Sequence, residues 1–365
     1  MKVGERFASE AHAPVLVIPG LGGSQLNATL AKPHTVHVYC TKNQGSHLQW
    51  LKISSLVASR DCFFDNIRLV YDDVDNVYYD SPGVTITPVG YGTMDGVNSL
   101  DNEFGFRSIT TYMAKLTAAF TAAGYPEWFS ATMDMIEEMY TEANGTQVHI
   151  LGHSMGGAMG SYLLANADPA WKAKYVASFI PMGAPLGGAP GVLKALISGA
   201  SVGMTFFNIS LVKPHDFAVA IRNWHAAVAD CIVTDASTGV CYGLNNISRL
   251  FVDANATSTA QIYSQTLLLD LGTAPPGVPV HCLIGNSVET EVAFSYPSGL
   301  GQQPAATTTM DGDGTVPGTS LRVCGQWGAR QSAPVELRTF DKAEHGAMPG
   351  NPEILDYLLQ IVTTS

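Results

Sequence analysis

The sequence predicts an α/β fold with a mainly parallel central sheet. Short apolar runs bounded by turn residues alternate with helical patterns, as strands and crossover helices do in such a sheet. One of these runs leads into a Gly-x-Ser-x-Gly motif, and a helical pattern follows it. The 365 residues, 46% of them hydrophobic, can bury a large core, so one catalytic domain over residues 1–365 is expected.

The expected strands are continuous apolar runs, which are typical of strands buried on both faces. They cover residues 14–18, 148–151, 176–180, 280–284 and 335–340. Helices are expected where apolar residues recur at spacings of three and four, and near residues 352–361. The recurring sets are Ile109, Met113, Leu116 and Phe120, and then Phe129, Met133, Ile136 and Tyr140. Residues 34–91 and 187–279 break the alternation, so both are expected to be insertions over the sheet.

The segment at residues 148–157 carries the motif as Gly152-His-Ser-Met-Gly156. An apolar run before it and a helical pattern after it are the context that a nucleophile elbow requires. The turn needs glycine at 152 and 156, because a side chain there would collide with neighbouring backbone. Ser154 is therefore the expected nucleophile, and the fold narrows to an α/β-hydrolase fold. His149 and His153 are expected to pack or hydrogen-bond, with His153 only filling the variable position.

A serine nucleophile needs a histidine to take its proton and a carboxylate to orient that histidine. In this fold the acid and then the histidine follow the serine along the chain. His345 is the expected base, because it is the only histidine beyond His281. The turn Met310-Asp-Gly-Asp-Gly-Thr-Val316 offers Asp311 and Asp313, and either fits the chemistry. A calcium loop is the competing interpretation, but further oxygen ligands and a closing Glu do not follow, so no metal is expected.

The oxyanion of the tetrahedral intermediate needs two backbone donors, typically the amide after the nucleophile and one from an earlier loop. The Met155 amide is the expected first donor. The loop at residues 18–24 follows the first expected strand, and its glycines would let N–H groups face a bound oxygen. A phosphate-binding loop is the alternative, but neither Lys-Ser/Thr nor a full Gly-x-Gly-x-x-Gly pattern follows.

The charge content of the sequence limits the classes of partner that the protein can bind. Only 14% of the residues are charged and the formal net charge is -12, so the clustered Lys and Arg that bind a phosphate backbone are lacking. No nucleic-acid partner and no organic cofactor are expected. The uncharged run at residues 195–212 is interrupted by glycine and barely reaches the length of a membrane span, so a cap or lid segment is expected instead.

Cysteines and sequons favour the secretory pathway, although residues 1–14 have no apolar signal-peptide core. The six cysteines include no Cys-x-x-Cys pair, so disulfides are expected rather than a zinc or redox site. Glycosylation is predicted at the Asn-x-Ser/Thr sequons of Asn27, Asn144, Asn208, Asn246 and Asn255.

In these motifs the chain resembles the family of lecithin:cholesterol acyltransferase and lysosomal phospholipase A2. The resemblance extends over residues 14–359. Its ordered motifs are Pro19-Gly-Leu-Gly-Gly-Ser-Gln-Leu26, Cys40 with Cys62, Asp65-Asn-Ile-Arg-Leu-Val-Tyr71, Gly152-His-Ser-Met-Gly156, Gly183-Ala-Pro-Leu-Gly-Gly188, His281-Cys-Leu-Ile-Gly285, Asp311-Gly-Asp-Gly-Thr-Val316 and Glu344-His345.

The resemblance implies Ser154 as nucleophile, His345 as base and Asp313, rather than Asp311, as acid. It implies oxyanion donors at the Leu21 and Met155 amides. Implied disulfides are Cys40–Cys62, which would close a membrane-binding excursion at residues 34–91, and Cys282–Cys324 near the acid loop. Cys231 and Cys241 are then left to pair within a cap or lid insertion at residues 187–279.

Apolar residues of the excursion, among them Leu48, Trp50 and Leu51, are candidates for contact with a lipid surface. The alternative is that they pack on the body of the domain. Trp50 matches a family tryptophan that lines the acyl end of the site. The chain departs from the family after Pro126, where about twenty residues that would form a strand beside residues 14–18 are missing.

The resemblance implies an enzyme that cleaves a fatty acyl ester of glycerophospholipids through an acyl-enzyme. Water or a lipid alcohol, such as a sterol or a ceramide-like alcohol, would accept the acyl group. Peripheral contact with a phospholipid membrane or lipoprotein surface is expected, in a lysosomal or extracellular setting. The alternatives are a neutral-lipid esterase of the same fold and a lipid-binding relative impaired by the missing strand.

Overall fold

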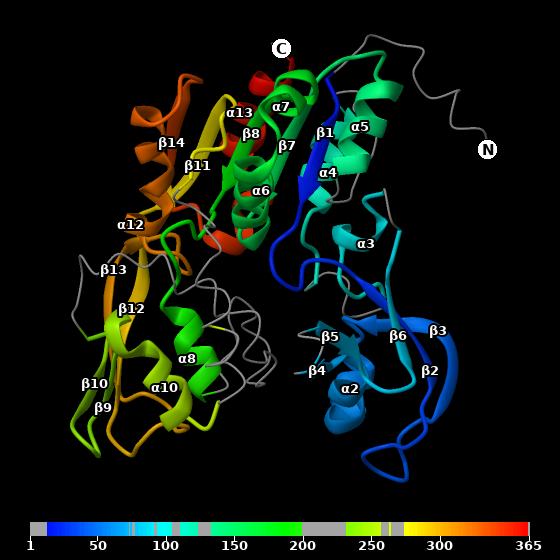
Figure 1. Ribbon diagram of the computed structural model, residues 1–365, viewed down its shortest axis with the longest axis vertical. Coiled ribbons are helices and arrows are strands. Elements are labelled where there is room, and N and C mark those ends of the chain that lie inside the picture. The colour runs from blue at the N-terminus through cyan, green and yellow to red at the C-terminus, as the bar shows by residue number, and fades with distance from the viewer. Residues whose placement is uncertain are drawn as a thin grey trace. The chain divides into compact units, whose positions relative to one another are not determined.

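The computed structural model describes residues 13–72, 74, 77–90, 93–103, 110–122, 133–198, 231–256, 263 and 274–363. Figure 1 labels the helices and strands of the chain. By its internal contacts the chain divides into two compact units. The first unit is Met1–Gly20 with Thr132–Ser365, and the second unit is Leu21–Ala131.

A five-stranded parallel sheet forms the centre of the first unit. Its order is β1-β7-β8-β11-β14, and every neighbouring pair is parallel. β1 and β7 are buried along their whole length, as strands covered on both faces are. All five strands lie where the apolar runs predict them, so the predicted α/β fold is confirmed. The strands are β1 (Val15–Ile18), β7 (Val148–His153), β8 (Val176–Met182), β11 (Val280–Asn286) and β14 (Val335–Asp341).

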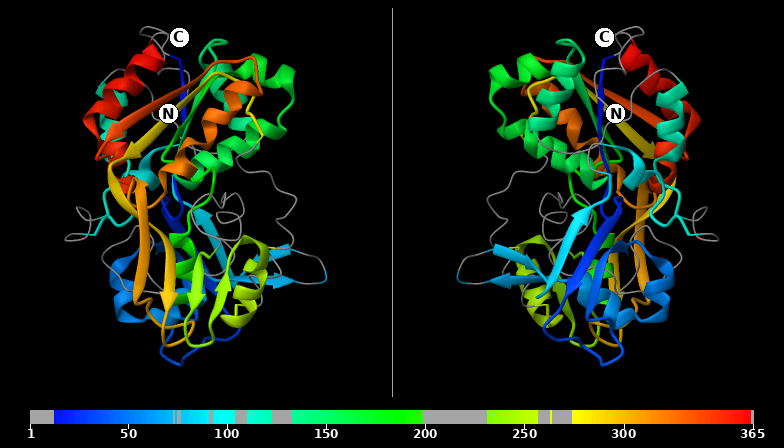
Figure 2. Two further views of the ribbon diagram at one scale, coloured as in Figure 1. Left: turned by 90° about the vertical axis from the view of Figure 1, so that its left-hand side faces the viewer. Right: turned by 90° about the vertical axis from the view of Figure 1, so that its right-hand side faces the viewer.

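Helices cover both faces of this sheet. α13 (Pro352–Thr363) lies on one face, and α6 (Met155–Asn166) and α7 (Pro169–Tyr175) lie on the other (Figure 2). α5 (Met133–Glu142) contacts β7 and buries Ile136, as its spacing predicts. Ile109 and Phe129 of the predicted helical faces lie outside the described residues.

The first unit contains a second sheet, which the sequence patterns do not predict. It has four strands in the order β10-β9-β12-β13. α8 (Gly191–Ser198) contacts strand β12 of this sheet. Lys194 Nζ of α8 lies 2.8 Å from a carboxylate oxygen of Glu291 in β12. α10 (Ile247–Asp253) follows β10, whereas residues 199–230 of the predicted cap lie outside the described residues. The strands are β9 (Val233–Asp235), β10 (Val240–Tyr242), β12 (Val288–Tyr296) and β13 (Ala306–Gly312).

Short helices complete the first unit. α12 (Gly318–Leu321) and the 3-10 helix η5 (Arg322–Ala329) connect β13 to β14. The 3-10 helix η3 (Leu244–Asn246) precedes α10, and the 3-10 helix η6 (His345–Gly350) precedes α13.

The second unit contains a three-stranded antiparallel sheet, a two-stranded ribbon and short helices. The sheet has the order β3-β2-β6, and its core includes Ala28, Leu30 and Val84. The predicted excursion at residues 34–91 falls within this unit. The strands are β2 (Leu26–Ala31), β3 (Asn43–Trp50) and β6 (Val84–Pro88), with β4 (Leu69–Asp72) and β5 (Val77–Asp80) in the ribbon. The helices are α1 (Ile53–Ala58), α2 (Arg60–Ile67), α3 (Asp95–Asn98) and α4 (Ala114–Ala122).

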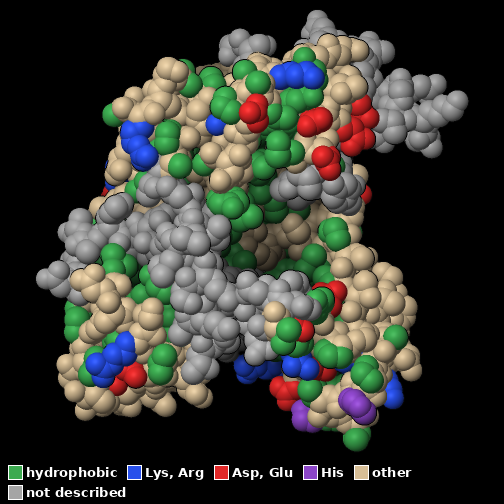
Figure 3. All heavy atoms as spheres, viewed as in Figure 1, with side chains coloured by type: hydrophobic (Ala, Val, Ile, Leu, Met, Phe, Trp, Pro, Cys, Tyr) green, Lys and Arg blue, Asp and Glu red, His purple; other side chains and the backbone are tan. Residues whose placement is uncertain are grey.

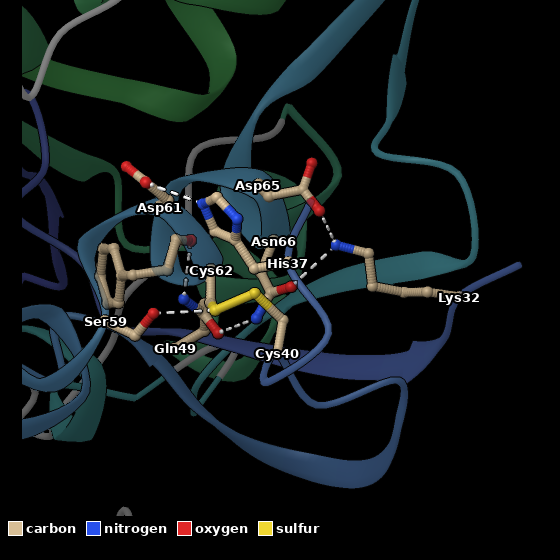
Figure 4. Close-up of a disulfide and its surroundings, with 10 residues drawn as sticks. Lys32, His37, Cys40, Gln49, Ser59, Asp61, Cys62, Asp65 and Asn66 are labelled. Atoms are coloured by element: carbon tan, nitrogen blue, oxygen red, sulfur yellow. Dashed lines mark hydrogen bonds and ion pairs between the residues drawn. A yellow bond between two sulfur atoms is a disulfide. The ribbon is translucent and has the colours of Figure 1, made fainter. Parts of the chain in front are cut away.

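The disulfide Cys40–Cys62 ties the connection between β2 and β3 to α2 (Figure 4). Beside it, the buried ammonium of Lys32 forms an ion pair with the buried carboxylate of Asp65. Asp65 also accepts a hydrogen bond of 2.9 Å from Arg68 Nε. Buried charges are tolerated when they are paired in this way. The ion pair of Lys32 with Asp65 and the disulfide therefore both link α2 to the segments around β2.

Charged side chains are sparse on the face drawn in Figure 3, in keeping with the 14% of charged residues. Of the helices in the described residues, none has the length and apolar character to cross a membrane.

β1 forms an edge of the central sheet in the part of the chain that the structure describes, since it pairs with β7 alone. The resemblance implies a missing strand after Pro126, and residues 123–132 lie outside the described residues.

Candidate active site

Ser154 lies in the tight turn between β7 and α6. Its φ of 56° and ψ of -126° place it in a backbone region that residues other than glycine rarely adopt, as is typical of a nucleophile elbow. The turn depends on Gly156, where an added Cβ would lie 2.1 Å from the Ile18 carbonyl oxygen. The start of α6 can therefore approach the end of β1 only with glycine at this position.

The structure brings Ser154, His345 and Asp313 into one hydrogen-bonded chain. Ser154 Oγ lies 2.9 Å from His345 Nε2, and His345 Nδ1 lies 2.7 Å from Asp313 Oδ2. With a proton on Nδ1 donated to the carboxylate, Nε2 can accept from the serine hydroxyl. The Asp313 side chain is 0% exposed, which keeps water from competing for this contact.

The tight turn that follows β13 separates the two candidate acids. Asp313 Oδ1 accepts hydrogen bonds from the backbone N–H groups of Thr315 and Val316 at 3.0 and 2.7 Å, which leaves Oδ2 for the histidine. Asp311 is exposed and instead accepts from the Ser287 N–H at 2.7 Å. Of the two carboxylates, Asp313 is therefore the one that contacts His345.

The amide of Met155 stands at the N-terminus of α6. The first N–H groups of a helix have no partner within the helix and lie at the positive end of its dipole, so they suit an oxyanion. Leu21 belongs to the second unit, where the neighbouring Gly22 carbonyl accepts a 2.7 Å hydrogen bond from Trp50 Nε1. Leu21 as the second donor stays a prediction.

His153 makes a contact that the sequence analysis did not identify. It is 2% exposed, and its Nε2 lies 3.0 Å from the backbone oxygen of His345. The two rings are 5.0 Å apart between centroids. Burial, together with the neighbouring His345, lowers the pKa of His153 to about 3. The hydrophobic run before the elbow gives no indication of this contact, because the partner lies 192 residues away.

The candidate lipid-contact residues of the second unit are mostly buried. Leu51 is 3% exposed, Trp50 is buried against Phe63, and Leu48 is half-buried. Burial of Leu51 favours the second of the two alternatives, packing on the protein, and lipid contact at Leu48, Trp50 and Leu51 stays a prediction. The exposed apolar side chains nearby in sequence are Val36, Val38, Tyr39 and Val57.

All three expected disulfides are present, namely Cys40–Cys62, Cys231–Cys241 and Cys282–Cys324.

The asparagines of the predicted glycosylation sequons differ in exposure and in hydrogen bonding. Asn144 and Asn255 are exposed in turns with positive φ, whereas Asn27 is half-buried within β2. Asn246 Nδ2 donates to the Cys241 carbonyl at 2.9 Å, and Asn208 lies outside the described residues. Glycosylation stays a prediction.

No cluster of His, Cys, Asp or Glu among the described residues is arranged to hold a metal ion. The site itself offers a hydroxyl, an imidazole, a carboxylate and backbone amides. These groups are the components of nucleophilic acyl transfer.

Comparisons with known proteins place the chain in a family. The family model of lecithin:cholesterol acyltransferase matches residues 46–224 and 243–352. The lysosomal phospholipase A and acyltransferase of Homo sapiens is 30% identical over 378 residues, covering 96% of this chain and 90% of that protein. The phosphatidylcholine-sterol acyltransferase of Mus musculus is 27% identical over 377 residues, covering 96% of this chain and 85% of that protein. The chain belongs to the lecithin:cholesterol acyltransferase family.

Proposed function

We propose that the protein is a serine-dependent lipid acyl hydrolase and acyltransferase with Ser154, His345 and Asp313 as its catalytic triad. The observation that carries the proposal is the bridging position of His345. Its two ring nitrogens lie 2.9 Å from Ser154 Oγ and 2.7 Å from Asp313 Oδ2. This is the geometry that a serine nucleophile needs for activation.

In the first half-reaction, Ser154 Oγ attacks the carbonyl carbon of a glycerophospholipid ester while its proton moves to His345 Nε2. The Met155 amide, with Leu21 as the predicted second donor, stabilises the negative charge on the former carbonyl oxygen. His345 then donates its proton to the departing lysophospholipid oxygen as the ester bond breaks. An acyl ester of Ser154 remains, and the buried Asp313 carboxylate has stabilised the transient imidazolium.

In the second half-reaction, water or a lipid alcohol gives its proton to His345 and attacks the acyl group. Ser154 leaves with the proton that His345 returns, so the free enzyme is regenerated. Water yields a fatty acid, and a sterol or ceramide-like alcohol yields a lipid ester. No step draws on a metal or an organic cofactor.

The names of the relatives support a lipid substrate, because one is a phospholipase and acyltransferase and another acts with phosphatidylcholine and sterol. We infer peripheral contact with a phospholipid membrane or lipoprotein surface. The exposed Val38, Tyr39 and Val57 of the second unit are suited to such contact. The three disulfides support passage through the secretory pathway to a lysosomal or extracellular site.

A non-catalytic lipid-binding protein is the second candidate, favoured by the edge position of β1 in the described sheet. Loss of a neighbouring strand would weaken β1, and β1 approaches the elbow through Ile18 and Gly156. The complete hydrogen-bonded triad favours the enzyme. A neutral-lipid esterase would share the triad and differ only in substrate.

The test is incubation of the full chain with a fluorophosphonate probe and with phosphatidylcholine vesicles that contain an added lipid alcohol. Ser154→Ala is compared with Ser161→Ala, which removes a hydroxyl from the buried face of the same helix, α6. Wild type and Ser161→Ala should be labelled and release or transfer fatty acid, and Ser154→Ala should do neither.

Each other result has a defined meaning. Turnover of triglyceride emulsion without turnover of vesicles would replace the proposal with the neutral-lipid esterase. A folded wild type that is neither labelled nor active would support the non-catalytic lipid-binding protein instead.

A further inference from the structure

His153 contacts the backbone of the catalytic histidine rather than its ring nitrogens. His153 ends β7, directly before the nucleophile, and His345 begins η6. The 3.0 Å contact from His153 Nε2 to the His345 carbonyl oxygen therefore links the two segments that supply nucleophile and base. This contact lies within the first unit.

The contact fixes the proton on the ring of His153. A carbonyl oxygen can only accept, so Nε2 must carry the hydrogen and donate it. Because burial lowers the pKa of His153 to about 3, the ring remains neutral throughout the physiological range. A neutral neighbour matters here, since a cation 5.0 Å from the His345 ring would oppose the protonation that acyl transfer requires.

With this contact, every polar group of His345 has a defined partner. Its backbone N–H donates to the Asp313 carbonyl oxygen at 2.8 Å, and its carbonyl oxygen accepts from His153. Its ring nitrogens contact Asp313 and Ser154. The backbone contacts restrict rotation of the segment that carries the ring, which is how a supporting residue keeps a catalytic group within reach of its target.

We propose that His153 is a positioning residue, whose neutral imidazole holds the His345 carbonyl and thereby keeps the His345 ring between Ser154 and Asp313. The inference rests on the proposed acyl transfer at Ser154. It assigns a function to a position that the elbow motif leaves variable. In the described residues, the titratable side chains in contact with the His345 ring are Asp313 and His153.

The test uses two replacements of His153 and one matched control. His153→Phe keeps a ring but removes the donor, and His153→Gln keeps an N–H donor near the Nε2 position. The control, His149→Phe, makes the same change at a second buried histidine of β7, whose Nδ1 lies 2.7 Å from Ser178 Oγ and not at the triad. Folding is checked by circular dichroism.

His153→Phe should lower both kcat on phosphatidylcholine vesicles and the rate of Ser154 labelling by about tenfold to a hundredfold, with KM unchanged. His153→Gln should recover both to within about threefold of wild type, and His149→Phe should keep the wild-type kcat. The pH profile of kcat/KM should keep its shape in His153→Gln, because the glutamine side chain is uncharged, as the buried His153 ring is.

Two results would overturn the inference. One is a folded His153→Phe with the wild-type kcat, and the other is a folded His153→Gln as slow as His153→Phe. If the variants do not fold, nitrogen-15 NMR of wild type decides, since a neutral ring with its proton on Nε2 is expected and a proton on Nδ1 alone contradicts the proposal. A wild type that the probe does not label would refute the proposed function instead, and the NMR result would still stand.

Discussion

His149 gives the protein a defined sensitivity to acid. Its side chain is 1% exposed within β7, and its Nδ1 lies 2.7 Å from Ser178 Oγ. Burial, and secondarily the nearby His281, lowers the pKa of His149 from the ordinary 6.5 to about 4. The pKa of His281 is itself lowered by burial, while its contact with Glu336 acts in the opposite direction.

The sign of the effect follows from the lowered pKa. The unfolded chain binds a proton on His149 below about pH 6.5, whereas the folded protein binds it only below about pH 4. The contribution of His149 to stability is therefore complete above about pH 6.5 and is lost as the pH falls toward 4. A pKa difference of about 2.5 corresponds to about 3 kcal/mol in total, of which about 2.5 kcal/mol is lost by about pH 4.5.

The assay is urea unfolding of wild type and His149→Asn at about pH 7 and about pH 4.5. Asparagine cannot titrate, so the variant should lose about 2.5 kcal/mol less stability than wild type between these conditions. His34→Asn, at an exposed histidine, controls for the loss of a histidine as such. An equal loss in wild type and His149→Asn would refute the reasoning, because burial would then not keep the ring neutral.

Three further outcomes concern the triad and a disulfide. Asp313→Asn should lower kcat on phosphatidylcholine vesicles about 10³-fold or more and Asp311→Asn less than about tenfold, because Asp313, and not Asp311, contacts His345, the proposed base; equal losses would contradict this assignment. Gly183→Ala should slow fluorophosphonate labelling at least ~tenfold, since φ at Gly183 is 58° and the new Cβ would lie 3.2 Å from His345 Nδ1; an unchanged labelling rate would contradict this. Replacing Cys40 and Cys62 by serine should lower the urea-unfolding free energy by about 3 kcal/mol, because the bond spans a separation of 22 residues; an unchanged urea midpoint would contradict this.

The central sheet and the elbow could be predicted because their physical requirements are local. Strands such as β7 and β8 are buried on both faces and therefore appear as apolar runs. The elbow requires small residues at fixed offsets from Ser154, which the sequence displays directly. The choice between Asp311 and Asp313 needed more than local chemistry, because both stand in one turn and only the fold determines which carboxylate faces His345.

The second sheet of the first unit could have been found in part. In β12 (Val288–Tyr296), burial alternates from Thr290 through Val292 and Phe294 to Tyr296, so the period of two was present in the sequence. Two residues weaken the hydrophobic alternation, because Thr290 is polar at a buried position and Ala293 is apolar on the outward face. β13 carries threonines at 307–309 that are exposed, so hydrophobic periodicity gives no indication of that strand.

The apolar residues of the second unit show what sequence patterns cannot decide. Trp50 and Leu51 are apolar in a short segment, and such residues suit either a lipid surface or a core. Phe63, thirteen positions after Trp50, packs its ring 6.4 Å from the Trp50 ring. That contact depends on how α2 folds back along β3, which is tertiary information. Exposure of Val38 and Tyr39 likewise follows from the fold and not from hydropathy.

The proposed triad lies in the first unit, whereas Leu21 and Trp50, which are predicted to assist it, lie in the second unit. Ser154, His345, Asp313 and the Met155 amide all belong to the first unit, so their geometry is established by its own sheet. Leu21 belongs to the second unit with Trp50, whose Nε1 donates to the carbonyl of Gly22. A change in the second unit that abolishes vesicle turnover but preserves labelling by a small phosphonate therefore affects lipid handling. A change that abolishes both has reached the nucleophile, its base or the oxyanion donors.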